Sequence, residues 1–274
     1  MIGFRALCCL GLLACSATAG RSQGADTTTV VPAPWVTRQD LAIIGVGAGL
    51  AYLAHQVDLD ARATVRSAGN QANGTLRALE RTGDLWGGSI ALGLGAAMWA
   101  GGVHTGRPTL AVVGLRAVES ITVSGLVTKA LKAGFGRARP RVSPTDAWDV
   151  EFGRGWDNDH EAFPSGHSTA AFAFAAAVTS ETMRRAPSRG ALVGTGTFAL
   201  AGVTAYARMH SDAHWLSDVT MGAAIGMASG WAVTRWHATR PGNRVDARLL
   251  PGVSPLVLQG PRGRTLIGAT IAWR

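Results

Sequence analysis

The chain has 274 residues, which is long enough for one large domain and short for two. Hydrophobic residues make up 47% and charged residues only 16%, against roughly 25% charged residues in soluble proteins. A chain of this composition either buries a large core or lies partly in lipid. Its formal charge of +9 favours anionic partners. The basic residues form no tract and no aromatic–basic ladder, so nucleic acid is not an expected partner.

The first 19 residues have the pattern of an export signal. Arg5 gives a short positive region, residues 6–14 are apolar, and residues 17–19 (Ala-Thr-Ala) form a small-x-small cleavage site. Residues 12–15 also resemble the lipobox of bacterial lipoproteins, in which the cysteine, here Cys15, is acylated. Both lipidation and an ordinary signal core remain open. Either way we expect an exported protein, in the periplasm or attached to a membrane.

Three regions follow the signal segment: a linker over 20–37, a core over 38–240 and a tail over 241–274. The linker is polar and then Pro-rich. The core is expected to be all-α, with six long helices and a polar segment (58–81) after the first that suits a solvated helix or a loop. The apolar stretches that predict these helices are 38–56, 84–104, 108–132, 168–183, 190–206 and 214–236.

Two other segments lack a helical pattern. Residues 141–163 carry six acidic residues and predict a loop that could act as a lid. The tail contains two β-prone segments, 254–260 and 265–273, separated by Pro-Arg-Gly-Arg. This pattern favours a β-hairpin or an irregular arm.

His214 and Asp218 form the first cluster with chemical potential. The two residues are four apart, so on a helix they share one face. A carboxylate in that position would hold the proton on one ring nitrogen and leave the other nitrogen as a nucleophile. The alternative is a surface contact without catalytic meaning.

The segment Pro164-Ser165-Gly166-His167 forms the second cluster, directly before an apolar helix. Ser165 suits the helix cap and Gly166 leaves its amide open, so the helix start would bind an anion. His167 could protonate a leaving oxygen as a general acid. Plain helix capping is the alternative.

Three cations form the third group: Lys132, Arg139 and Arg208. Fork-like donors stabilise the negative charge that spreads over a phosphoryl group during transfer. Solvated side chains, or cations that complement a helix C-terminus, are the alternative.

The order and spacing of these clusters resemble the three-part signature of the type 2 phosphatidic acid phosphatase family. That family includes bacterial non-specific acid phosphatases and vanadium-dependent haloperoxidases. The resemblance spans residues 132–218 and agrees with the family's six-helix bundle. Its motifs are Lys132-x6-Arg139-Pro140, Pro164-Ser165-Gly166-His167 and Arg208-x5-His214-x3-Asp218.

The resemblance also implies a role for each motif residue. Lys132, Arg139 and Arg208 would bind the phosphate oxygens. Ser165 and Gly166 would complete the phosphate cradle.

The implied reaction passes through a phosphohistidine. His214 would attack phosphorus, His167 would protonate the leaving group, and Asp218 would orient His214 before water releases phosphate. No metal or other cofactor is implied, and vanadate would act as an inhibitor. One position departs from the family, because Ala207 replaces the usual serine before Arg208.

Two alternatives to a phosphatase remain open at this stage. Vanadate bound at His214 would instead make a haloperoxidase, and a bundle that only binds phosphate or lipid headgroups would need no catalysis. The substrate is a phosphorylated lipid or small molecule, which the sequence does not identify further, and it does not indicate an oligomeric state.

Membrane topology gives one further expectation. If all six helices crossed a bilayer after signal cleavage, Lys132 would face the cytoplasm and the basic turn at 184–189 would lie outside, against the positive-inside rule. Arg116 and Glu119, which are expected to pair at i and i+3, are costly in lipid. We therefore expect an extracytoplasmic active site, in a bundle that is either embedded in the membrane or anchored to it.

Overall fold

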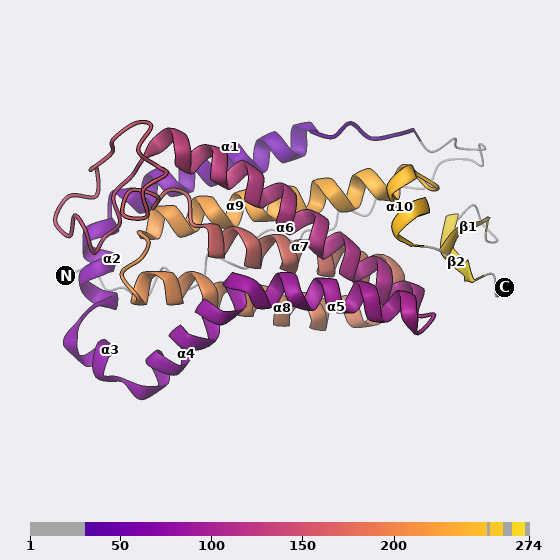
Figure 1. Ribbon diagram of the computed structural model, residues 1–274, viewed down its shortest axis with the longest axis horizontal. Helices are drawn as coiled ribbons and strands as arrows, with labels where there is room; N and C mark the ends of the chain where they lie inside the picture. Colours follow the sequence, from indigo (N-terminus) through magenta and orange to yellow (C-terminus); the bar gives the residue numbers. More distant parts are fainter. Residues whose placement is uncertain (1–30, 251–252, 260–264, 272–274) are drawn as a thin grey trace.

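The computed structural model describes residues 31–250, 253–259 and 265–271, so the predicted signal segment and Cys15 lie outside the described residues. The long helices run side by side along the longest axis of the molecule (Figure 1). The helices are α1 (Arg38–His55), α2 (Asp58–Val65), α3 (Ala68–Ala72), α4 (Gly74–Leu85), α5 (Ala91–His104), α6 (Pro108–Phe135), α7 (Gly166–Arg185), α8 (Pro187–His210), α9 (Leu216–Ala238) and α10 (Arg244–Leu249).

The described part of the chain contains more helices than the six long ones expected. The polar segment after α1 folds into α2, α3 and α4, which form an arm beside the bundle (Figure 1). The apolar run predicted as one helix over 84–104 is interrupted by a π-helical turn, η2 (Trp86–Ile90), in which Gly88 has φ −82° and ψ −111°. Gly88 permits this break, because a residue without a Cβ can adopt backbone angles that other residues avoid. The helix α10 was not expected.

The long helix α6 begins and ends at the signals that the sequence provides. Pro108 lies in its first turn, and Gly136 caps its end in the left-handed conformation, with φ 57°. The helix therefore continues past Lys132 to Phe135. The expected pair of Arg116 and Glu119 is confirmed at 2.8 Å.

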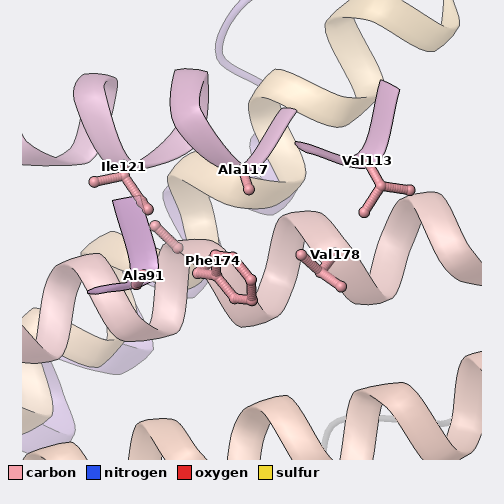
Figure 2. Close-up of a cluster of buried hydrophobic side chains, with 7 residues drawn as sticks. Ala91, Val113, Ala117, Ile121, Phe174 and Val178 are labelled. Atoms are coloured by element: carbon pink, nitrogen blue, oxygen red, sulfur yellow. The ribbon is translucent and has the colours of Figure 1, made fainter. Parts of the chain in front are cut away.

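The core between α5, α6 and α7 combines small and large apolar side chains. Val113, Ala117 and Ile121 of α6 face Phe174 and Val178 of α7, with Ala91 of α5 beside them (Figure 2). Alanine on one helix opposite phenylalanine on the next lets the helices pack closely.

The helices α7 and α9 approach each other through a glycine stripe on α9. A Cβ added at Gly222 would lie 2.6 Å from the carbonyl oxygen of Ser165, and one at Gly226 would lie 2.4 Å from that of Thr169. Such distances leave no space for any side chain. Glycine at these positions therefore fixes the first turns of α7 and α9 next to each other.

The remaining segments close the two ends of the bundle. The loop between α6 and α7 lies at the same end as the turn between α8 and α9 (Figure 1). At the other end, Trp99 of α5 donates to the carbonyl of Leu249 in α10 at 2.7 Å. In the tail, β1 (Val253–Gln259) pairs antiparallel with β2 (Thr265–Ile271).

Among the described helices, α6 and α8 are each long and apolar enough to cross a membrane. The pair α1 and α2, bent by 69°, could supply a third crossing. This is fewer than the six crossings considered from the sequence. Several perimeter side chains are apolar and well exposed, among them Leu53 on α1, Leu126 on α6 and Leu192 on α8. The bundle thus has an apolar surface that suits contact with lipid.

Gly226→Ala should destabilise the fold, because its new methyl group would meet the backbone of α7. Overpacking of this kind costs about 1–3 kcal/mol. The matched control is Gly196→Ala in α8, where no atom lies within 4 Å of the new Cβ. It should leave stability unchanged or raise it by up to about 1 kcal/mol. Thermal unfolding followed by circular dichroism measures both, and equal melting temperatures would contradict the packing argument.

Candidate active site

The three predicted motifs meet at one end of the bundle. Lys132 lies in the last turn of α6 and Arg139 follows it in the loop. His167 lies in the first turn of α7, and Arg208 lies in the last turn of α8, just before the turn that carries His214. Lys132, Arg139 and His214 are all buried, so their side chains lie in the interior at this end of the bundle.

His214 precedes α9 instead of lying on it. The helix begins at Leu216 with Trp215 as its N-cap, so the predicted shared helical face of His214 and Asp218 does not exist. Nδ1 of His214 lies 2.7 Å from the carbonyl oxygen of Ala162, whereas Oδ2 of Asp218 is 3.6 Å away. A backbone carbonyl only accepts hydrogen bonds, so Nδ1 carries the proton in the neutral ring and Nε2 keeps the lone pair.

Asp218 holds the turn around His214 together. Its Oδ2 accepts the amide of Trp215 at 2.7 Å, which caps α9, and its Oδ1 accepts from Arg137 at 2.5 Å. Its backbone carbonyl accepts the amide of Ser165 at 3.0 Å and so joins the start of α7 to the start of α9. Burial raises the pKa of Asp218, and the cation of Arg137 opposes that rise.

The three motif cations are held by oxygens from other segments. Nζ of Lys132 donates to the backbone carbonyl of Glu161, and the side chain of Glu161 binds Arg139 at 2.9 Å. Arg208 pairs with Asp84 at 2.7 Å. The buried Nε of Arg208 has no partner within the residues that the structure describes. These carboxylates offset the repulsion between cations in the ligand-free site.

Both histidines lie in the field of these same three cations. Burial, and then Lys132, Arg139 and Arg208, hold the pKa of His214 well below its ordinary value. Burial, and then Arg208 among the nearby cations, lower the pKa of His167 to about 4. Both rings are therefore neutral at pH 7, and both lie near Lys132, Arg139 and Arg208.

The first turn of α7 adds backbone N–H donors beside the three motif cations. Ser165 is the N-cap of α7, and its hydroxyl accepts the amide of Ser168 at 3.5 Å. A Cβ added at Gly166 would lie 3.9 Å from Cε of Lys132, so the cation lies directly at the helix start. First-turn amides have no partner within a helix, and together with Lys132 they can hold an anion.

The π-helical turn η2 forms the wall behind His167. A Cβ at Gly87 would lie 2.9 Å from Cβ of His167, and one at Gly88 would lie 3.5 Å from its Nε2. The two glycines thus leave space for the imidazole. Single π-helical turns within helices are found frequently at functional sites.

The departure at Ala207 also has a structural setting. Ala207 is fully buried, and a Cβ added at Gly83 of α4 would lie 2.6 Å from its Cβ. The arm therefore packs directly against the position where the family has serine.

Sequence reasoning missed several residues that complete the site. Glu161 and Asp84 were not singled out as partners of the cations, and Arg137 was not distinguished from Arg139 in the same motif. No local spacing reveals these partners, because they come from different segments. Within the described residues, no group of three or more His, Cys, Asp or Glu side chains is placed to hold a metal ion.

Comparison with known proteins gives a family and a fold. Residues 113–241 match the family model of the PAP2 superfamily. The structure is similar to that of a transmembrane PAP2-type phosphatidylglycerolphosphate phosphatase from Bacillus subtilis, with a TM-score of 0.58 and 18% sequence identity. The alignment covers 76% of this chain and 100% of that one, and at this identity it shows a shared fold alone. No curated protein sequence matches the chain significantly.

The low pKa of His167 predicts a loss of stability in acid. Its folded-state pKa is about 4 against an ordinary 6.5, so as the pH falls through this window the unfolded chain binds the proton first. The free energy of unfolding should therefore fall between about pH 6.5 and pH 4. His167→Asn removes this contribution, so the variant should gain stability relative to wild type on acidification. Denaturant unfolding at several pH values measures the difference.

The matched control for this experiment is His104→Asn, which changes an exposed histidine at the end of α5. If both variants shifted equally with pH, the burial of His167 would not be the cause.

Proposed function

The helical core of this chain belongs to the PAP2 superfamily, and we propose that it hydrolyses a phosphomonoester or lipid (pyro)phosphate through a phosphohistidine on His214. One observation carries the proposal: the proton of the neutral His214 ring is held on Nδ1 by Ala162. Nε2 therefore keeps its lone pair, in the field of three cations. That is the arrangement that a nucleophile aimed at a phosphoryl group requires.

In the first step, Nε2 of His214 forms a bond to phosphorus while the bond from phosphorus to the leaving oxygen breaks. Lys132, Arg139 and Arg208 stabilise the charge on the phosphoryl oxygens. His167 delivers a proton to the leaving oxygen. A bound phosphate anion favours the protonated ring, which offsets the effect of the cations on its pKa.

In the second step, water attacks the phosphohistidine and the bond from phosphorus to Nε2 breaks. His167, now neutral, accepts a proton from that water as a general base. Inorganic phosphate is released and His214 returns to its starting form. The cations supply the electrostatic stabilisation, so we propose that the reaction needs no metal.

The substrate is proposed to be a lipid phosphate at a membrane surface. The loop between α6 and α7 forms part of the site through Ala162 and Arg139, and it carries large exposed aromatic side chains. Phe152 is 82% exposed and Trp156 is 74% exposed. Tryptophan favours the interface between lipid and water, and exposed phenylalanine can insert into its apolar side. Together with the spanning-length helices, they support a membrane-associated protein, whose site we propose to be extracytoplasmic.

His214→Ala should abolish hydrolysis of p-nitrophenyl phosphate, because it removes the nucleophile. The expected loss is at least about 10³-fold, with the circular dichroism spectrum unchanged. Wild-type activity should persist in EDTA and be inhibited by vanadate. A folded His214→Ala variant with full turnover would refute the mechanism, and vanadate-dependent bromination without hydrolysis would favour a haloperoxidase. Binding of phosphate without either reaction would favour a binding protein.

The paired change Phe152→Ser and Trp156→Ser should weaken hydrolysis of lipid phosphate in vesicles and leave p-nitrophenyl phosphate hydrolysis intact. The reason is that the loop loses its apolar contact with lipid while the three motif cations and both histidines are unchanged. Vesicle sedimentation and phosphate release measure the effect. Val245→Ser, at the other end of the bundle (Figure 1), is the control that should change neither. An equal loss on both substrates would contradict a role in lipid contact.

A further inference from the structure

Arg137 is a buried arginine beside the candidate site whose donors are all taken by the protein. Its guanidinium stands between two carboxylates, Asp218 at 2.5 Å and Asp58 at 2.9 Å. It also donates to the hydroxyl of Ser217 at 2.7 Å and to the carbonyl of Ala147 at 2.7 and 3.0 Å. These contacts use all five N–H groups of a guanidinium. Arg137 therefore has no donor left for a substrate oxygen and cannot act as a phosphate ligand.

Arg137 instead holds both of the groups that face Nδ1 of His214. Its side chain binds Asp218, whose Oδ2 lies 3.6 Å from Nδ1. Its backbone carbonyl accepts the amide of Ala162 at 3.0 Å, and the carbonyl of Ala162 accepts from Nδ1 at 2.7 Å. One residue thus sets the position of two oxygens on which the orientation of the imidazole depends.

Asp58 is the second carboxylate at Arg137 and comes from a distant part of the chain. It is the first residue of α2, outside the matched residues 113–241, and it is fully enclosed. Besides Arg137 it binds the amide of Ser217 at 2.9 Å and the hydroxyl of Ser217 at 2.6 Å. Nδ1 of His55 lies 3.0 Å from it as well. Asp58 therefore holds the start of α9 directly and through Arg137.

The net charge of Asp58, Arg137 and Asp218 matters for the proposed reaction. Transfer of a phosphoryl group to Nε2 gives the imidazole ring positive character while its Nδ1 proton is retained. Two carboxylates around one guanidinium leave a net negative charge behind the ring, which stabilises that state. Loss of Asp58 would remove this charge and let the guanidinium move, and the side chain of Asp218 would move with it.

We infer that Asp58 and Arg137 are positioning residues that hold His214 in its reactive orientation, with Asp58 supplied by the segment that precedes the matched residues. The inference rests on the proposed function, because it assigns the two residues to the orientation of the proposed nucleophile. Neither residue is a ligand of the phosphate, so their loss should lower kcat and leave the affinity for phosphate unchanged.

The test is Asp58→Asn assayed with p-nitrophenyl phosphate well below its melting temperature. Asp58 reaches His214 only through Arg137 and Ser217. By analogy with the outer partners that orient metal-bound histidines, we expect kcat to fall about 10- to 100-fold. The inhibition constant for inorganic phosphate should stay at its wild-type value, because the three motif cations are untouched. A wild-type kcat, or a change confined to phosphate binding, would overturn the inference.

The matched control is Arg62→Gln, also in α2. Arg62 binds Asp212 through two contacts of 2.7 Å, so it fastens the same helix to the turn between α8 and α9 without touching Arg137. This variant should lose stability and keep kcat. If it lowered kcat as much as Asp58→Asn does, docking of α2 alone would explain the effect and the positioning role would be wrong.

Arg137→Lys covers the case in which Asp58→Asn does not fold. Lysine keeps the buried positive charge but cannot bridge both carboxylates with a fork of donors. The folded variant should show the same fall in kcat with unchanged phosphate inhibition, and full kcat would overturn the inference. Failure of the proposed function would look different from failure of this inference. It would appear as wild-type protein without turnover, or as an active His214→Ala variant.

Discussion

The hydrogen bond between Nδ1 of His214 and the carbonyl oxygen of Ala162 is the interaction on which the candidate site depends. The carbonyl can only accept, so the bond fixes the proton on Nδ1 and leaves Nε2 with its lone pair. Burial and three nearby cations keep the ring neutral. Without this bond the ring could rotate or change tautomer, and the nitrogen that keeps the lone pair would no longer be defined.

A site that brings three cations together must also offset their mutual repulsion. Glu161 does this for Arg139, and Asp84 does it for Arg208, with contacts of 2.9 and 2.7 Å. Both carboxylates come from segments outside the motifs, one from the loop before α7 and one from α4. The loop and the arm therefore contribute the negative charges that stabilise Arg139 and Arg208 in the ligand-free site.

The bundle determines how closely these groups approach. The glycine stripe of α9 lets α7 lie against it, and the bond from the amide of Ser165 to the carbonyl of Asp218 joins the two helix starts. On the other side, the glycines of η2 leave room for His167. Helix contacts without side chains between them thus bring two histidines from distant parts of the sequence to the same three cations.

The sequence by itself determined the long helices and the motif residues. Apolar stretches predicted α1 and α6 to α9 within a few residues, because burial on a helical face requires that pattern, and Arg116 and Glu119 paired as their spacing predicts.

Tertiary structure alone decided the break at η2, the helical arm and the partners of His214. Ala162 lies 52 residues from His214, and Asp58 lies 159 residues from Ser217. Hydrogen bonds over such separations depend on the path of the loop and the docking of α2. Local periodicity and spacing carry no information about either, which is why the sequence suggested Asp218 as the direct partner of His214.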